Sequence, residues 1–320
     1  AAMPLTEFEL IDRYLSRLGA RRDDVLLGVG DDAALVRPPA GLELALAADT
    51  LVEGVHFPSS LSPEDIGHRV LAVNLSDMAA MGAEPAWALL TLTLPRAEPE
   101  WLRGFSGGLH ELARRHGVQV VGGDTTAGPL TATIAMVGFV PPGQALRRVG
   151  ARPGDEVWVS GTPGDAAAGL ACLMGRLDGP GPVLEPLVQR FTRPEPRVPL
   201  GLVLRGVATA CIDVSDGLAG DLGKLCAASG VGAQLDSTSL PRSAALRAAV
   251  DPEAARRHVL AGGDDYELLF TLPPGTDAAG LERGSGVALT RIGTIVAGYG
   301  LTLDGAALDR ELLHGFDHFG

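Results

Sequence analysis

The apolar residues of the chain fall into two patterns, short runs and helical spacing. Short runs typical of strands cover residues 25–29, 42–47, 87–94, 119–121 and 131–140. Helical spacing predicts helices over residues 5–18, 63–81 and 99–116. Ser62 and Pro63 are suited to begin the second helix, and Gly117 to end the third. The first half of the chain is therefore expected to alternate strands and helices.

A break at Pro141, Pro142 and Gly143 separates this series from a second one. There we expect a strand over 156–160, a second strand that ends at residue 212, and further strands over 231–235, 266–272 and 289–303. Helices are expected over 165–174 and 216–229. The Pro- and Gly-rich span 178–197 predicts a surface connection. A chain of 320 residues is long enough for two domains. We therefore predict two α/β (or α+β) domains, residues 1–145 and 146–320, rather than a barrel of eight repeats.

The composition argues against several classes of protein. A formal net charge of −13 disfavours a nucleic-acid partner, which needs a concentrated basic surface. No apolar stretch reaches the roughly 20 residues of a membrane span. The opening residues lack the basic start of a secretory signal, so we expect a cytoplasmic protein with no membrane partner. Cys172, Cys211 and Cys226 have neither disulfide nor zinc spacing, and we expect buried thiols.

Aspartates recur where the apolar runs end. They stand in Gly30-Asp31-Asp32, Ala48-Asp49-Thr50, Gly122-Gly123-Asp124-Thr125, Ile212-Asp213-Val214-Ser215-Asp216-Gly217 and Gly262-Gly263-Asp264-Asp265. In α/β proteins, ligands bind outside the carboxyl ends of the strands, so these side chains are expected to converge. Lys224 is the only lysine in the chain. Divalent cations, Mg²⁺ in particular, are therefore the expected partners of these carboxylates.

Each aspartate also has an ordinary structural interpretation, as a turn residue or a helix cap. Ser215 and Asp216 stand where they could cap a helix beginning near Gly217. The functional interpretation depends on the number of such positions rather than on any one of them. Asn74 and Asp77 strengthen it, because they lie three residues apart and share one face of an otherwise apolar helix.

Other phosphate and metal motifs fit less well. The turn at residues 28–33 resembles a dinucleotide-binding loop, but its two carboxylates would repel a pyrophosphate unless a metal ion intervened. Residues 217–224 lack the spacing of a P-loop, and the aspartates lack the series of ligands of an EF-hand. The spacing favours His56 as an ordinary loop histidine, with a ligand contact as the alternative. Arg147 and Arg148 read as a solvated pair or as a clamp for a triphosphate.

The ordered strings of the chain are similar to the thiamine-monophosphate kinase family, over nearly the whole length. They are GVGDDAALV (28–36), ADTLVEGVHF (48–57), AVNLSDMAAMGAEPAWALLTLTLP (72–95), VVGGDTTAGP (120–129), GFVPPGQALRRVGARPGDEVWVSGTPGDAAAGL (138–170), IDVSDGL (212–218), AGGDDYELLFT (261–271) and GFDHF (315–319). The resemblance implies the aminoimidazole-ribonucleotide-synthetase-like fold. In that fold the sheet of the N-terminal α/β domain pairs across a homodimer, and the C-terminal α/β domain closes the active site.

The resemblance also implies a reaction and a set of site residues. The family transfers the γ-phosphoryl group of ATP to thiamine monophosphate, giving thiamine diphosphate and ADP with several Mg²⁺ ions and no assigned general base. Carried over residue by residue, the metal ligands are Asp32, Asp49, Asp77, Asp124, Asp213 and Asp216. The ATP contacts are Gly123, Asp124, Arg148 and Ser215, and the substrate contacts are His56, Asp264 and the aromatic Phe316.

The chain departs from the family pattern in two places. Relatives carry hydroxyl residues where this chain has Ala47 and Ala48, so a backbone carbonyl or water must serve there. Relatives commonly carry Glu where this chain has Asp264, which shortens the reach to substrate. The roles of Asp31 and Asp265 stay open. Two alternatives also remain, a purine-pathway synthetase of the same superfamily and an acidic calcium-binding interaction module.

Overall fold

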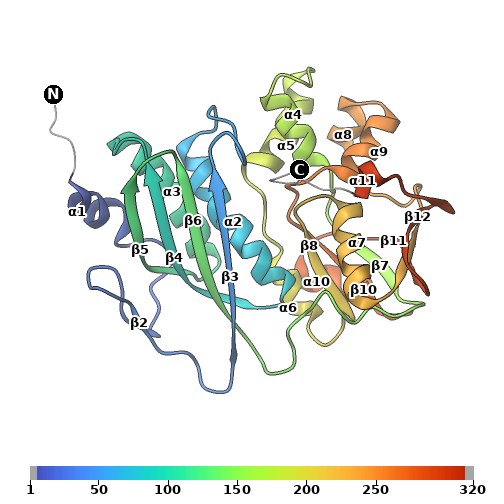
Figure 1. Ribbon diagram of the computed structural model, residues 1–320, viewed down its shortest axis with the longest axis horizontal. Coiled ribbons are helices and arrows are strands. Elements are labelled where there is room, and N and C mark those ends of the chain that lie inside the picture. The colour runs from blue at the N-terminus through green and yellow to red at the C-terminus, as the bar shows by residue number, and fades with distance from the viewer. Residues whose placement is uncertain (1–5, 314–320) are drawn as a thin grey trace. The chain divides into compact units, whose positions relative to one another are not determined.

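The N-terminal segment of the described chain forms a short helix with a capping box. The computed structural model describes residues 6–313 (Figure 1). Helix α1 (Glu7–Leu10) begins at Thr6, whose hydroxyl accepts from the Glu9 backbone N–H while the Glu9 carboxylate bonds back to Thr6. The chain continues as a π-helical turn, η1 (Ile11–Leu15), with Leu10 and Leu15 buried. The helix predicted over 5–18 is thus present in shorter form.

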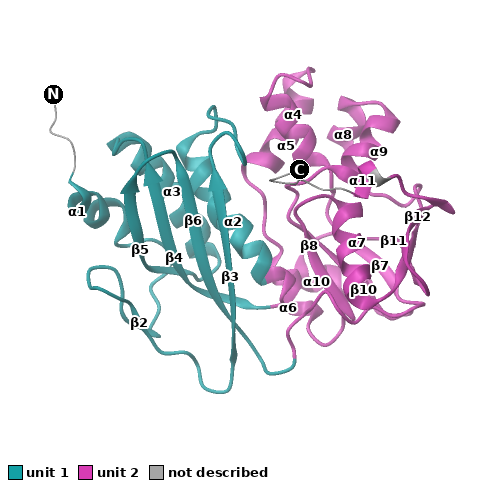
Figure 2. Cartoon of the chain, viewed as in Figure 1, with its two compact units in different colours: residues 1–78, 83–143 teal, residues 79–82, 144–320 magenta. Residues whose placement is uncertain are grey.

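The chain divides into two units (Figure 2). Unit 1 comprises residues 1–78 and 83–143, and unit 2 comprises residues 79–82 and 144–320. Residues 79–82 comprise the last two residues of helix α2 (Pro63–Ala80) and the turn after it, and they belong with unit 2, where the Arg205 guanidinium donates to the Gly82 carbonyl at 2.5 Å. No helix within residues 6–313 has both the length and the hydropathy to cross a membrane.

Unit 1 contains a four-stranded sheet in the order β3-β6-β4-β5, in which only β4 and β5 are parallel. Its strands are β3 (Glu43–Val52), β4 (Glu84–Leu94), β5 (Gln119–Ala127) and β6 (Thr131–Val140). Strands β1 (Val25–Leu27) and β2 (Leu35–Val36) form a separate pair. Because β3 and β5 run longer than predicted, Asp49 and Asp124 lie inside strands, not after them. Threonines beside both aspartates favour extended backbone, and each strand is paired along that length.

Two helices, α2 (Pro63–Ala80) and α3 (Pro99–Arg115), cover one face of this sheet (Figure 1). The two helices touch backbone to backbone, since a Cβ at Gly67 would lie 2.0 Å from the Phe105 carbonyl oxygen. On the opposite face, Val25, Val36 and neighbours pack against Trp87 and Phe139. The rest of that face exposes apolar side chains, with Leu46 74% accessible.

Unit 2 is built on a seven-stranded mixed sheet in the order β13-β12-β9-β11-β7-β10-β8. Its strands are β7 (Glu156–Ser160), β8 (Ala210–Val214), β9 (Gly232–Leu235), β10 (Glu267–Leu272), β11 (Leu289–Val296), β12 (Gly300–Leu303) and β13 (Ala306–Ala307). Its helices are α4 (Asp165–Leu173), α5 (Gly181–Thr192), α6 (Val198–Leu204), α7 (Leu218–Ser229), α8 (Ala244–Ala249), α9 (Pro252–Ala261), α10 (Ala278–Ser285) and α11 (Arg310–Leu313). The strand expected over 289–303 is two strands. The three cysteines are free thiols, and Cys211 and Cys226 are buried as expected, but Cys172 is only half-buried.

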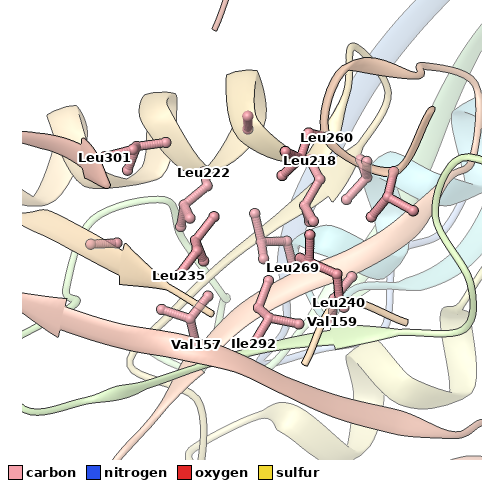
Figure 3. Close-up of a cluster of buried hydrophobic side chains, with 14 of the residues drawn as sticks. Val157, Val159, Leu218, Leu222, Leu235, Leu240, Leu260, Leu269, Ile292 and Leu301 are labelled. Carbon is pink, nitrogen blue, oxygen red and sulfur yellow. The ribbon is translucent and has the colours of Figure 1, made fainter. Parts of the chain in front are cut away.

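The core of unit 2 lies between the sheet and helices α7 and α9 (Figure 3). Val157 and Val159 of β7, Leu269 of β10 and Ile292 of β11 face Leu218 and Leu222 of α7 and Leu260 of α9, and all are buried. Alternate residues of β10 face the other way and are also buried. The sheet is therefore covered on both faces along β10, which holds the ends of β8 and β10 in place.

The surface connection predicted over 178–197 is wrong, because this span contains helix α5. Leu187 and Phe191 of α5 are fully buried. A Cβ at Gly169 would lie 2.1 Å from the Leu187 carbonyl oxygen, so α4 and α5 cross in backbone contact. Pro180 and Pro182 occur at the start of the helix, where proline is tolerated. They were mistaken for loop signals.

Gly169→Ala is expected to destabilise unit 2 by about 1–3 kcal/mol, because the added methyl group would overlap the α5 backbone. Gly223→Ala is the matched control, since Gly223 lies within helix α7 with no atom within 4 Å of its added Cβ. That control should gain roughly 0.5–1 kcal/mol of stability through helix propensity. Urea unfolding followed by circular dichroism measures both changes. Equal effects of the two substitutions would contradict the close crossing.

Candidate functional site

A cavity of about 860 Å³ lies within unit 1 and contains several of the predicted site residues. Its walls are the loop 28–34, the segment 87–90 of β4 and the segment 120–125 of β5, with Phe8, Ile11 and Leu15 from the N-terminal helix. Asp31, Asp32, Gly123 and Asp124 are among the lining residues. Two motifs that are about ninety residues apart in the sequence therefore share one mainly apolar cavity with acidic groups on its wall.

Glycine is required at position 123 of this cavity. Gly123 has φ of 144°, and a Cβ there would lie 1.7 Å from the Leu90 carbonyl oxygen. The strand β5 thus approaches β4 more closely than any side chain permits. Gly123 is therefore required by the packing of β5 against β4, and it lines the cavity beside Asp124.

Asp32 and Asp124 carry charge that the described structure does not neutralise. Both are exposed, and within residues 6–313 neither forms an ion pair. Asp31 has a local role, because its Oδ1 accepts a hydrogen bond from the Asp32 backbone N–H at 2.8 Å. Two uncompensated carboxylates lining one cavity fit an external cation, and oxygen donors of this kind suit Mg²⁺.

Asp49 and Asp77 lie in the layer between β3 and α2. The Asp49 backbone N–H donates to the Asn74 side-chain oxygen at 3.0 Å, and Asn74, fully buried, donates in turn to the Val70 carbonyl. Asp77 follows Asn74 by three residues on the same helix and is half-buried. Asn74 therefore fixes α2 against β3 and is a structural residue rather than a free ligand.

His56 is held in a tight turn after β3. Its Nδ1 accepts from the Val52 backbone N–H at 3.0 Å, and the Gly54 N–H closes the turn onto the Phe57 carbonyl. In a neutral imidazole this bond leaves the proton on Nε2, which makes Nε2 a donor. The ring is half-buried.

In unit 2, Asp213 lies in strand β8 and the loop after β8 carries Ser215 and Asp216. A buried carboxylate holds this loop. Asp221, 1% exposed, accepts the backbone N–H groups of Ser215 and Asp216, each at 3.0 Å. Burial raises the pKa of Asp221, although bonds from Lys224 and the loop oppose this. The capping role considered for Ser215 and Asp216 is wrong, because Gly217 is the N-cap of α7 and no side chain caps the helix.

Lys224 connects two of these acids. Its ammonium lies 2.8 Å from Asp221 Oδ1 and also pairs with Asp216 Oδ2. The sequence did not single out Asp221, and Lys224 entered only as the one lysine of the chain and as part of a segment that fails as a P-loop. A signal was available, since Asp221 is a charged residue between Leu218 and Leu222 on the buried face of a helix.

Asp264 lies beside this loop. Its backbone N–H donates to the Ser215 carbonyl at 2.8 Å, and the Tyr266 N–H donates to the Val214 carbonyl at 2.8 Å. Asp264 and Tyr266 have positive φ of 69° and 53°, and the tyrosine hydroxyl contacts Asp264 Oδ1 at 3.2 Å. The structure therefore brings Ser215, Asp216 and Asp264 together.

Asp265, whose role stayed open, is structural. It is fully buried, and its carboxylate accepts from Gly164 N–H at 2.6 Å and Ala166 N–H at 3.1 Å, at the first turn of α4. Burial raises the pKa of Asp265 well above the ordinary value. Its position beside Asp264 shows that neighbouring aspartates of one motif do different work.

Arg148 lies at the opposite end of α7 from Ser215. Its side chain is exposed, and its carbonyl accepts from Ser229 Oγ at 3.0 Å, at the C-terminal end of that helix. Asp213 is 7% exposed and pairs with Leu268 across β8 and β10. Phe316 lies outside the described residues. Arg148 and Ser215 would thus contact different parts of a ligand.

A buried ion cluster that sequence analysis missed lies at the start of β10. Glu267, fully buried, accepts from Arg190, from Arg197 through two nitrogens at 2.6 Å, and from Ser160. Burial alone would raise the pKa of Glu267, but the two guanidinium groups hold it below its usual value. Arg190 and Arg197 are therefore both paired with the buried carboxylate of Glu267.

The described residues contain no preformed metal centre. Within 6–313, no group of three or more His, Cys, Asp or Glu side chains is placed to hold a metal ion. Asp32 and Asp124 share the cavity of unit 1, Asp49 and Asp77 lie on the helix-covered side of its sheet, and Asp213 and Asp216 belong to unit 2. The six-aspartate metal set remains a prediction.

Comparison with known proteins follows the same division of the chain. The AIR synthase related protein, N-terminal domain, matches residues 30–140, and the C-terminal domain of that family matches residues 152–305. The thiamine-monophosphate kinase of Escherichia coli (strain K12) is 46% identical over 329 residues, covering 99% of each chain. The chain therefore has the predicted two-domain fold.

Solved structures agree. The thiamine-monophosphate kinase from Stenotrophomonas maltophilia K279a superimposes with a TM-score of 0.88 at 48% identity, covering 96% of this chain and 99% of that one. A structure described as AaThiL complexed with AMPPCP and TMP has a TM-score of 0.77 at 31% identity, covering 96% and 97%.

Glu267→Gln is expected to cost about 3–5 kcal/mol of stability at neutral pH, because two largely enclosed guanidinium groups, 20% and 17% exposed, lose their buried counter-charge. The lowered pKa of Glu267 means that its ionised form favours the fold. This contribution is present above pH 4.5 and is lost as pH falls through the folded-state pKa. The variant should lack that part of the acid dependence. Urea unfolding at several pH values tests this, with the exposed Glu253→Gln as control.

Proposed function

The chain belongs to the thiamine-monophosphate kinase family of AIR synthase related proteins, and on this premise we propose that it phosphorylates thiamine monophosphate with ATP. The products would be thiamine diphosphate and ADP. The cavity of unit 1 carries the proposal furthest, because the loop 28–34 and the glycine-rich part of β5 meet there over apolar walls. A volume of about 860 Å³ lies within the usual range of small-ligand sites.

The proposed reaction needs positioning more than acid–base chemistry. The acceptor is a phosphate oxygen that is already anionic, so no side chain has to remove a strongly held proton. We accordingly assign no general base. The main obstacle is repulsion between two polyanions, and it is increased by a chain of net charge −13.

We propose that Asp32, Asp49, Asp77, Asp124, Asp213 and Asp216 hold Mg²⁺ ions. Bound Mg²⁺ would neutralise the phosphate oxygens and align them for transfer. The unpaired charges of Asp32 and Asp124 support this assignment in unit 1. In unit 2, the ammonium of Lys224 beside Asp216 supports it, because it shows that this carboxylate already accepts a cation. Backbone oxygens or water would serve where Ala47 and Ala48 carry no donor.

The remaining predicted contacts fall into two groups, one for the phosphates and other parts of ATP and one for thiamine monophosphate. Gly123 through its backbone and Ser215 through its hydroxyl, with Asp124 through metal, would hold ATP phosphates. The Arg148 guanidinium, at the other end of α7, would contact another part of ATP. His56 is suited to thiamine monophosphate, because its Nε2 donates when Nδ1 accepts from Val52. Asp264 and Phe316 would contact the cationic thiamine rings.

The purified protein is expected to form ADP only when ATP, Mg²⁺ and thiamine monophosphate are all present. A coupled ADP assay with and without each component measures this, and excess chelator should abolish the signal. Free thiamine and unrelated phosphate monoesters are the acceptor controls.

Two outcomes would favour the alternatives. ADP formation with another acceptor and none with thiamine monophosphate would favour a purine-pathway synthetase. Calcium binding without ATP turnover, in a folded sample, would favour an acidic interaction module.

We further propose that the enzyme is a cytoplasmic homodimer formed through the open face of the unit 1 sheet. Leu44, Leu46 and Leu89 are 44%, 74% and 44% exposed on that face. Leu46 of β3 pairs with Val137 of β6, so the exposed leucines continue an apolar stripe across the strands. An apolar sheet face of this kind is typical of a protein interface, and a second copy supplies a self-complementary partner.

Leu46→Asp is expected to convert the dimer to monomer, because a charge would be buried at the interface. Sedimentation equilibrium measures the change. Tyr299→Asp is the control, because Tyr299 is 87% exposed and belongs to unit 2. A wild-type chain that is monomeric at micromolar concentration would exclude the proposed interface.

A further inference from the structure

The ammonium group of Lys224 forms an ion pair with Asp216, whose carboxylate is proposed to bind metal. Its ammonium pairs with Asp216 Oδ2 and with Asp221 Oδ1, and the Lys224 and Asp216 side chains are 43% and 33% exposed. Lys224 is the only lysine in 320 residues, so this cation stands at one particular acid rather than in a general basic surface.

The two acids that Lys224 contacts are held very differently. Asp221 is 1% exposed and keeps two backbone hydrogen bonds, from Ser215 and Asp216, whatever Lys224 does. Asp216 is half-exposed, and the described hydrogen bond to its carboxylate comes from Lys224. If the ammonium moves away from Asp216, Asp221 still retains its backbone partners. Movement of the Lys224 ammonium away from Asp216 therefore leaves the buried carboxylate of Asp221 with hydrogen-bond partners.

The helix supports such a movement. Lys224 follows Asp221 by three residues on α7, so both side chains lie on one face of the helix. A flexible four-carbon side chain can stay paired with Asp221 while its ammonium leaves Asp216. A metal ion arriving at Asp216 would meet electrostatic repulsion from the ammonium until this happens.

We propose that Lys224 is the resident counter-cation of Asp216 and competes with a divalent metal ion for that carboxylate, an inference that rests on the proposed role of Asp216 as a metal ligand. Lys224 acts through Asp216 and is a positioning residue. It offsets the charge of Asp216 while metal is absent, and it lowers the affinity for metal.

The single lysine makes the test direct. Protein labelled with ¹³Cε-lysine gives one lysine signal in an NMR spectrum, which reports on the surroundings of Lys224. Titration with MgCl₂ alone, without nucleotide, is expected to shift this signal with the same midpoint as Mg²⁺ binding measured by calorimetry. Mg²⁺ binding that leaves the signal unmoved would overturn the proposal, as would the absence of Mg²⁺ binding.

A variant series gives the second measurement. Lys224→Met removes the charge and keeps the aliphatic length, and it should tighten Mg²⁺ binding by about 1.5- to 5-fold, the usual range for one exposed ion pair. Lys224→Arg should keep the wild-type affinity. Arg256→Met is the matched control, since it removes one charge from a comparable surface pair of unit 2. Unchanged or weaker Mg²⁺ binding by Lys224→Met would refute the competition.

These experiments are independent of turnover. They contain neither ATP nor thiamine monophosphate, so a failed kinase assay would leave their result standing. Conversely, loss of the competition would leave the proposed phosphoryl transfer untouched.

Discussion

Uncompensated negative charge is the physical constraint that organises this molecule. The chain carries a formal charge of −13 and one lysine, and the described structure commits its cations to particular acids. Arg190 and Arg197 are used by Glu267, and Lys224 bridges Asp216 and Asp221. Asp32 and Asp124 line a cavity without such partners. Negative charge is thus neutralised where the fold needs it and left open where a ligand could bring a cation.

Where side-chain cations are missing, backbone amides take their place. Asp265 is bound by N–H groups at the first turn of α4, and Asp221 by N–H groups of the loop after β8. A buried carboxylate that gathers several amides holds the conformation of the peptide that supplies them. The candidate site in unit 2 is therefore placed by acids that do not themselves face a ligand.

Much of the fold could be predicted from the sequence, and the features that could not be predicted depend on contacts between distant parts of the chain. Apolar periodicity located most strands and the longer helices. Helix α5 was missed because prolines near its start resemble loop signals, whereas the burial of Phe191 depends on a distant helix. Asp221 was missed because its function depends on which backbone groups lie opposite it. No spacing in the sequence reveals that.

Adjacent aspartates show why residue type alone could not assign roles. Asp264 and Asp265 are neighbours, yet one lies half-buried beside Ser215 and the other is buried under α4. Asp31 similarly accepts a bond from the backbone of Asp32, and Asp221 accepts one from the backbone of Asp216. In each case one carboxylate is tied to peptide, and another is presented at a loop. Recurrent acids in this chain therefore supply both the proposed ligands and the supports that place them, and the backbone contacts of each carboxylate, rather than its residue type, separate the two.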